Sequence, residues 1–316
     1  MSVELKAPTP FDPKNWGERV SIETIARTRI PTQGPDSWRP VPHETFVEMI
    51  EEGFSRHGFE ISEPVHYRGK SRGNKKIPDL PEFGRFLSLY GLRHPGLADL
   101  DGITWEAGFG NSLDMTVALG GGLGRRVSVC SNGEYMGSTS GFKRKHTKGI
   151  DEESTGHFET IYSLADLAIG GILRQAENEE KRILRWQNTE CSDDDARYVA
   201  VEAAKAGVVG AAGALRVLEH WKTPEHPEFA DRNLWSLNNA FTSEDRGSNL
   251  FTQGDRFQRL DGIMNARFGF APVISVDDGE RIGDSPNTER ESVLPPGFHA
   301  GVDAPESRLR VFSADF

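Results

Sequence analysis

Cysteine is scarce in this sequence, since only Cys130 and Cys191 occur among 316 residues. Two cysteines exclude a disulfide framework and a four-cysteine zinc site, so we expect a reducing compartment. No run of about 18 apolar residues occurs, which excludes a membrane-spanning helix. The opening residues, MSVELKAPTPFDPKNW, lack the apolar stretch of a secretory signal. We therefore expect a soluble cytoplasmic protein that makes no contact with a membrane.

Signatures of metal, nucleotide and nucleophile sites are also missing. The nine histidines form no HExxH pair, and no pair of cysteines completes a zinc site. The glycine run ALGGGLGRR at 118–126 lacks the Gly-Lys-Ser/Thr ending of a phosphate loop, so we expect a plain turn there. The segment GNSLD lacks the GxSxG pattern of a hydrolase and predicts a polar turn, or a helix start capped by Ser112. We expect neither a metal ion nor a cofactor.

Charge is distributed unevenly along the chain. The sequence has 37 Lys and Arg against 48 Asp and Glu, a formal net charge of −11. Residues 64–150 nevertheless hold 13 basic and 7 acidic side chains, a balance of +6, so the remaining chain sums to −17. A basic middle in an acidic chain is typical of a polyanion-binding site. It also fits a glycine-rich sheet whose exposed edges carry Lys and Arg to prevent aggregation.

The first half of the chain predicts one helix and a set of short strands. Apolar residues recur at helical spacing after Pro42, and Gly58 follows the last turn as a stop signal. Asn132-Gly133 predicts a hairpin turn. The strand-like runs are residues 59–67, 85–92, 103–109, 126–130 and 134–138.

From about Ser154 the pattern becomes helical. An apolar stripe continues to Trp186, which predicts a long helix with a bend at Gly170-Gly171. Ser192 and the acids after it predict the start of a second helix. Shorter helices are expected over 212–222, 233–242 and 255–267. This order favours an α+β fold with an N-terminal helix, a central, mostly antiparallel sheet with hairpins, a long helix and a C-terminal helical region.

Three segments are expected along the chain. Residues 1–40, rich in Pro and polar residues, form an N-terminal arm that Trp16 and Trp38 pin to a neighbouring surface. Residues 41–270 form an α+β domain, strand-rich over 59–150 and helical over 154–270. Residues 271–316 carry nine acids and four arginines without periodicity, which predicts a weakly structured acidic tail.

Two basic segments, RGKSRGNKK at 68–76 and FKRKHTKG at 142–149, are the main functional candidates. Cations on loops contact phosphates, and neighbouring aromatic rings stack on single-stranded bases. The same cations on an exposed hairpin edge also protect it from aggregation. The candidate nucleic-acid-binding residues are Lys143, Arg144, Lys145, Lys148, Arg68, Lys70, Arg72, Lys75 and Lys76, with Tyr67, Tyr90, Tyr135 and Phe142 as candidate stacking rings.

An ordered set of motifs spans about residues 25–270: RTRIPT, VPHETFVEMIEEGF, LRHP, GNSLD, VSVCSNG, FKRKHT, WQNTECSDDDARYVAVEAAKAGVV and WSLNNAFT. In this set the chain resembles the phage- and plasmid-associated family known as domain of unknown function 932. Members often have His where this chain has Leu113, so we expect Asn111-Ser112-Leu113-Asp114 to be structural here. The resemblance implies a mobile-element protein in the cytoplasm of a host cell. The order of elements is also similar in outline to that of phage single-strand annealing proteins, which implies a homo-oligomer.

We therefore expect a phage- or plasmid-encoded protein that binds single-stranded nucleic acid and acts in DNA replication or recombination, by single-strand annealing. The acidic tail is expected to occupy the nucleic-acid site until it is displaced. Two alternatives stay open. One is an interaction protein that binds a host protein through its acidic surface, without DNA contact. The other is an enzyme whose polar site combines Asn111, Asp114, Asn132 and His146.

Overall fold

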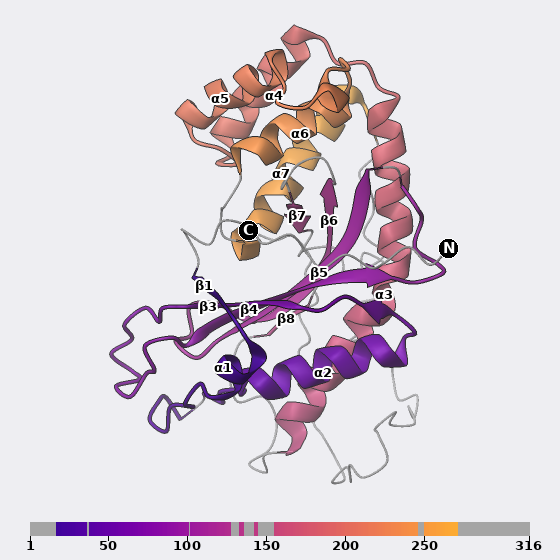
Figure 1. Cartoon of the computed structure of the whole chain (residues 1–316). Coiled ribbons are helices and arrows are strands. Elements are labelled where there is room, and N and C mark those ends of the chain that lie inside the picture. The colour runs from indigo at the N-terminus through magenta and orange to yellow at the C-terminus, as the bar shows by residue number, and fades with distance from the viewer. Residues whose placement is uncertain are drawn as a thin grey trace, which may run out of the picture.

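The computed structural model describes residues 17–36, 38–100, 102–127, 133–135, 142–144, 155–245 and 250–270. The expected α+β fold is confirmed, with an antiparallel sheet, a long helix and a lobe of helices (Figure 1). The helices are α1 (Ile22–Ala26), α2 (His43–Arg56), α3 (Thr155–Gln187), α4 (Asp193–Lys205), α5 (Ala211–Lys222), the 3-10 helix η2 (Pro227–Phe229), α6 (Leu234–Glu244) and α7 (Leu250–Phe268). The strands are β1 (Glu18–Val20), β2 (Glu60–Ile61), β3 (Val65–Gly69), β4 (Arg85–Arg93), β5 (Ile103–Ser112), β6 (Leu119–Val127), β7 (Gly133–Tyr135) and β8 (Phe142–Arg144).

All strand pairs in the described part of the chain are antiparallel. The main strand order is β1-β3-β4-β5-β6-β7, while β2 pairs with β4 and β8 pairs with β6. Two strands, β2 and β3, take the place of the single strand expected over 59–67, and both pair with β4. Pro64 lies between them and has no N–H to donate to the ladder, which explains the interruption. Gly133 begins β7, whereas Asn132 lies outside the described residues.

The glycine run at 118–126 lies in strand β6, so the prediction of a plain turn there is wrong. Gly121 lies directly opposite Phe109 of β5. A Cβ atom on Gly121 would lie 2.1 Å from the Gly108 carbonyl oxygen and 2.5 Å from Cδ1 of the Phe109 ring. The glycine is therefore required by the close approach of a neighbouring strand and a large ring.

One hydrophobic core lies between the sheet, α2 and the first half of α3. The ring of Phe54 on α2 lies 5.4 Å from that of Tyr90 on β4 and 5.8 Å from that of Phe109 on β5. Helix α2 ends at Arg56, and Gly58 follows with a φ of +75°, a backbone angle that favours glycine. The predicted helix and its stop signal are both confirmed.

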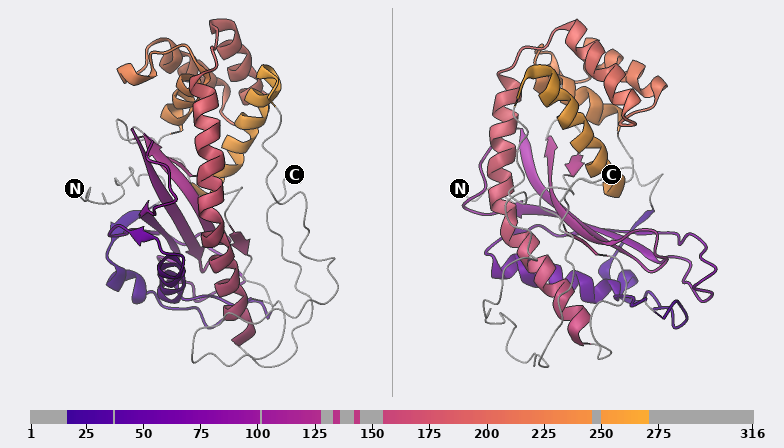
Figure 2. Two further views of the ribbon diagram at one scale, coloured as in Figure 1. Left: turned by 90° about the vertical axis from the view of Figure 1, so that its right-hand side faces the viewer. Right: turned by 180° about the vertical axis from the view of Figure 1, so that it is seen from behind.

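Helix α3 joins this core to a second one. Its 33 residues give a length of about 50 Å, and the helix continues without a break through Gly170-Gly171, while its axis changes direction between its two ends (Figure 2). Gly170 instead allows close packing, since a Cβ atom there would lie 2.9 Å from Cε1 of His57. Further along α3, Ile183 and Trp186 enter the core of the helical lobe, which α4, α5, α6 and α7 complete.

The helical lobe follows the sequence prediction closely. Ser192 caps α4, because its hydroxyl oxygen accepts from the N–H of Asp195 while the Asp195 carboxylate accepts from the N–H of Ser192. The shorter helices expected after it are α5, α6 and α7. Every residue of α6 from Leu234 to Thr242 is buried, which makes α6 the central helix of the lobe.

The segment before α2 adds to the sheet and to the first core. Strand β1 pairs with β3, and Ile25 of α1 belongs to the core. Trp38 is buried, as expected of an anchor, whereas Trp16 and the segment 271–316 lie outside the described residues. Among the helices of the described part of the chain, none has both the length and the apolar character that crossing a membrane requires.

Candidate nucleic-acid interface

The first basic segment continues from β3 into the loop between β3 and β4, residues 70–84. Main-chain and side-chain hydrogen bonds close this loop on itself: the N–H of Ser71 donates to the carbonyl oxygen of Glu82 at 2.8 Å. The loop is also tied to the next turn of the sheet, because the N–H of Arg72 donates to the carboxylate of Asp114 at 2.7 Å. Its cations are therefore held at a defined place at one end of the sheet.

Three of these cations, Arg72, Lys75 and Lys76, point their charge into solvent. All three are exposed. Within the described residues, no ion pair joins any of them to a carboxylate. Exposed cations that no carboxylate of the described residues neutralises are available to neutralise phosphates.

The two cations nearer the strand have partners. Arg68 forms an ion pair with Glu18 of β1, and the Lys70 ammonium lies 3.5 Å from the Glu82 carboxylate. Both lie over the ring of Phe83, at 4.1 Å for the Arg68 guanidinium and 5.9 Å for the Lys70 ammonium. These contacts orient the side chains of Arg68 and Lys70, and the two carboxylates offset part of their positive charge.

Sheet register brings the second basic segment to the same end. The loop at 70–84 leaves β3 at Gly69, and β8 ends nearby in the register at Arg144, opposite Leu119. One row of paired residues crosses the sheet in the order Tyr67, Leu87, Gly110, Gly120 and Lys143. Four strand spacings separate the ends of this row, about 19 Å. Lys143 and Arg144 lie in β8, and Lys145 and Lys148 lie outside the described residues.

Two of the expected stacking rings are unavailable. Tyr67 and Tyr90 are both 0% exposed, and burial raises the pKa of Tyr90 well above its usual value. Neither ring can stack on a base, so that part of the prediction is wrong. Tyr135 lies in β7 and Phe142 in β8. The aromatic ring that the described residues place among the cations is Phe83.

Three arginines of the basic middle are buried rather than on its surface. Arg125 Nε lies 2.8 Å from the Glu179 carboxylate of α3, and Arg126 Nη2 lies 2.9 Å from the Glu106 carboxylate of β5. Burial lowers the pKa of the Arg85 guanidinium, and the nearby Asp114 carboxylate opposes that effect. The balance of +6 over 64–150 therefore overstates the positive charge that a ligand would meet.

Two of the four polar residues proposed for an enzyme site, Asn111 and Asp114, have structural partners. Asn111 is fully buried, and its Nδ2 donates to the carbonyl oxygen of Val41 at 2.8 Å. Asp114 accepts from the N–H and the hydroxyl of Thr116, in addition to its bond from the loop. Asn132 and His146 lie outside the described residues. Asn111 and Ser112 end strand β5, and the turn that the sequence predicts begins at Leu113 and Asp114.

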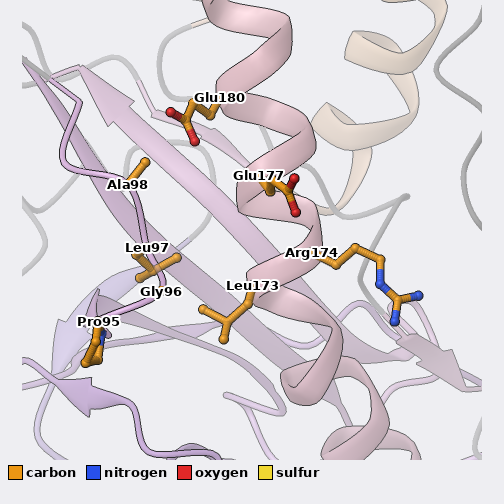
Figure 3. A pocket seen from close by; sticks show the side chains of 8 residues that line it. All are labelled: Pro95, Gly96, Leu97, Ala98, Leu173, Arg174, Glu177 and Glu180. Atoms are coloured by element: carbon orange, nitrogen blue, oxygen red, sulfur yellow. The ribbon is translucent and has the colours of Figure 1, made fainter.

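An open hollow of about 520 Å³ lies elsewhere, between the loop at 95–98 and α3 (Figure 3). Leu97, Leu173 and Glu177 are among the residues that line it. The Glu177 carboxylate already forms an ion pair with the Lys181 ammonium, at 2.6 Å. No cluster of His, Cys, Asp and Glu in the described residues could hold a metal ion.

Comparison of the chain with family models, with curated proteins and with solved structures finds no match.

Proposed function

We propose that this protein binds single-stranded nucleic acid through the end of the sheet that carries the loop at 70–84 and, four strand spacings away, the end of β8. The observation that carries the proposal is the exposed trio Arg72, Lys75 and Lys76, held on a loop that Asp114 fixes to the sheet. The register of β8 supports it, because Lys143 and Arg144 lie across the same end of the sheet. We propose action in the replication or recombination of a phage or plasmid element, by single-strand annealing.

The bulk charge of the protein opposes this binding but does not prevent it. A net charge of −11 repels a polyanion at long range, yet screening limits that repulsion to about 8 Å at physiological salt. Cations that touch the phosphates act inside this distance. Binding through them would be independent of base sequence and strongly salt-dependent.

Replacement of Arg72, Lys75 and Lys76 by Ala together should weaken binding of a labelled single-stranded oligonucleotide. Each lost phosphate contact reduces the slope of log affinity against log salt by about 0.7, so the slope should fall by about 2. At 0.1 M salt, taking 1 M salt as the reference, we expect a loss of affinity of about 100-fold. Fluorescence anisotropy over a range of salt concentrations measures both quantities.

A matched control removes three cations from the helical lobe, Arg197, Lys205 and Lys222, and changes the net charge by the same amount. It should leave the slope unchanged. Equal losses in the two triple variants would show a general charge effect and contradict this interface. No binding by the wild type at low salt would retire the nucleic-acid function in favour of a protein partner.

Removal of residues 271–316 should tighten binding of the same oligonucleotide severalfold. The segment carries nine acids and four arginines, so its removal changes the net charge from −11 to −6. A tethered polyanion competes with nucleic acid for a basic surface at a high effective concentration. Anisotropy with the shortened and full chains measures the effect, and unchanged affinity would exclude the tail as a competitor.

A further inference from the structure

A segment before α2 is fastened to the basic loop by one carboxylate. Asp79 accepts hydrogen bonds from the N–H of Thr32 at 2.7 Å, the Thr32 hydroxyl at 2.9 Å and the N–H of Gln33 at 3.2 Å. In return, the Arg29 guanidinium donates to the main-chain carbonyl of Asp79 at 2.6 Å. The N–H of Thr32 does most to hold the pKa of Asp79 below its usual value. We call these four bonds the Asp79 clip.

The clip brings further positive charge to the loop. Arg29 and Arg27 are both exposed, and Asp79 lies only three residues from Lys76. Arg29 uses a main-chain carbonyl, not a carboxylate, as its partner, so its charge is not neutralised by an ion pair within the described residues. By contrast, the Asp79 carboxylate accepts hydrogen bonds from three donors of Thr32 and Gln33. The Arg29 guanidinium is therefore held at the same loop that carries the exposed trio, while the Asp79 carboxylate accepts the donors of the segment.

We propose that the segment 27–33 is part of the nucleic-acid interface, with Arg29 contacting a phosphate and Asp79 acting as its positioning residue. This inference rests on the proposed function, and it extends the site to residues far away in the sequence. It also reverses a simple expectation. Removing an acid from a basic surface should strengthen the binding of a polyanion, whereas removing the acid that positions Arg29 should weaken it.

The experiment measures single-stranded oligonucleotide binding by anisotropy, across a range of salt, for the full-length variants Arg29→Ala and Asp79→Ala. Each lost phosphate contact costs about fivefold in affinity at 0.1 M salt, taking 1 M salt as the reference, and about 0.7 in slope. We expect Arg29→Ala to lose about fivefold, and Asp79→Ala to lose up to the same amount although it raises the net charge by one. Combining the two changes should cost little more than Arg29→Ala alone, because Asp79 acts through Arg29.

Two further variants separate position from charge. Asp36→Asn removes an exposed acid of the neighbouring segment that takes no part in the clip, and it should bind as tightly as the wild type or more tightly. Thr32→Val removes one donor of the clip without a change of charge, and a smaller loss than that of Asp79→Ala is expected. Trypsin cleavage after Arg27 and Arg29 should be faster in Asp79→Ala, which reports release of the segment independently of binding.

The outcomes separate the inference from the proposed function. If the wild type binds while Asp79→Ala binds more tightly with an unchanged slope, Asp79 acts as a charge alone and the inference is overturned. Full binding by Arg29→Ala overturns it as well, and leaves the basic loop as the site. If the wild type does not bind, the proposed function fails and this role of the segment fails with it.

Discussion

Replacing Glu179 by Gln should lower the free energy of unfolding by about 3–5 kcal/mol, the largest effect we expect from one polar substitution in this protein. Glu179 lies on α3 and is only 2% exposed. One of its carboxylate oxygens lies 2.8 Å from Nε of Arg125 and 2.6 Å from Nη2 of Arg182. The glutamine would keep the shape of the side chain but leave two buried guanidinium groups without this counter-charge.

The surroundings of this cluster make the loss severe. The Arg125 guanidinium lies 4.7 Å from the centre of the Trp235 ring, and that of Arg182 lies 4.7 Å from the centre of the Trp186 ring. The Asp261 carboxylate of α7 lies 3.5 Å from the Arg182 guanidinium. Rings of this kind attract a cation but do not neutralise it, so the desolvation of the two arginines would lose the counter-charge that they share.

Helix α3 supplies a matched control for this prediction. Glu177, two residues earlier, is exposed and pairs with Lys181 at 2.6 Å. Glu177→Gln should change the free energy of unfolding by less than about 0.5 kcal/mol, as exposed i,i+4 pairs do. Urea unfolding followed by far-UV circular dichroism and tryptophan fluorescence measures both variants. A Glu179→Gln protein as stable as the control would show that solvent or other groups compensate the two arginines.

The buried ion pairs of Glu179 with Arg125 and Arg182 are only weakly indicated by the sequence. The apolar stripe of α3 runs through Ile172, Ala176, Ile183 and Trp186, and Glu179 takes the position between the middle two. A charged residue inside an apolar stripe predicts a buried ion pair, but not its partner. Arg125 is 54 positions away, and only the packing of β6 against α3 brings the two together.

Elements with local causes could be predicted from the sequence. Gly58 ends α2 through its positive φ, and Ser192 starts α4 through a capping box, both set by residues a few positions apart. The role of Gly121 could not, because it depends on Phe109 in the facing strand. The same applies to the candidate site. The sequence alone indicates the basic loop. It does not indicate Arg29, which contacts this loop through the main-chain carbonyl of Asp79, 50 positions later in the chain.

For Tyr67 and Tyr90, the sequence predicted a place on the nucleic-acid surface that the structure does not give them. Their place beside basic residues in the sequence suggested stacking on bases, but both faces of the sheet are covered here, since every residue of β4 from Arg85 to Leu92 is buried. Tyr90 points into the core against Phe54, while its neighbours Leu89 and Gly91 face the other side of β4. Proximity along the chain therefore says little about which residues share a surface within a sheet.

The stability of this protein should fall by about 3 kcal/mol in acid because of a single histidine. His66 of β3 is 5% exposed, and its Nδ1 lies 2.5 Å from Oγ of Ser88 on the neighbouring strand. Burial lowers the pKa of His66 from 6.5 to about 4, and the charge of Glu23 on α1 only partly opposes this effect. The folded protein therefore resists a proton that the unfolded chain accepts readily.

The sign of the effect follows from which state binds the proton. Above about pH 7 both states are neutral at His66, and its contribution to stability is complete. As the pH falls from about 6.5 to 4, protonation favours the unfolded chain, and the loss approaches about 3 kcal/mol at 1.4 kcal/mol for each pKa unit. About 2 kcal/mol of this should be lost by pH 5.

His66→Asn keeps a hydrogen-bond acceptor near Ser88 but has no group that titrates here. Its absolute stability should be lower, since it leaves space beside Phe86, but its urea midpoint should change less between pH 7.5 and 5 than that of the wild type. His220→Gln on α5, outside both cores, is the control and should keep the wild-type pH dependence. If His66→Asn loses stability in acid as steeply as the wild type, then His66 accepts a proton in the folded state, and the acid sensitivity arises elsewhere.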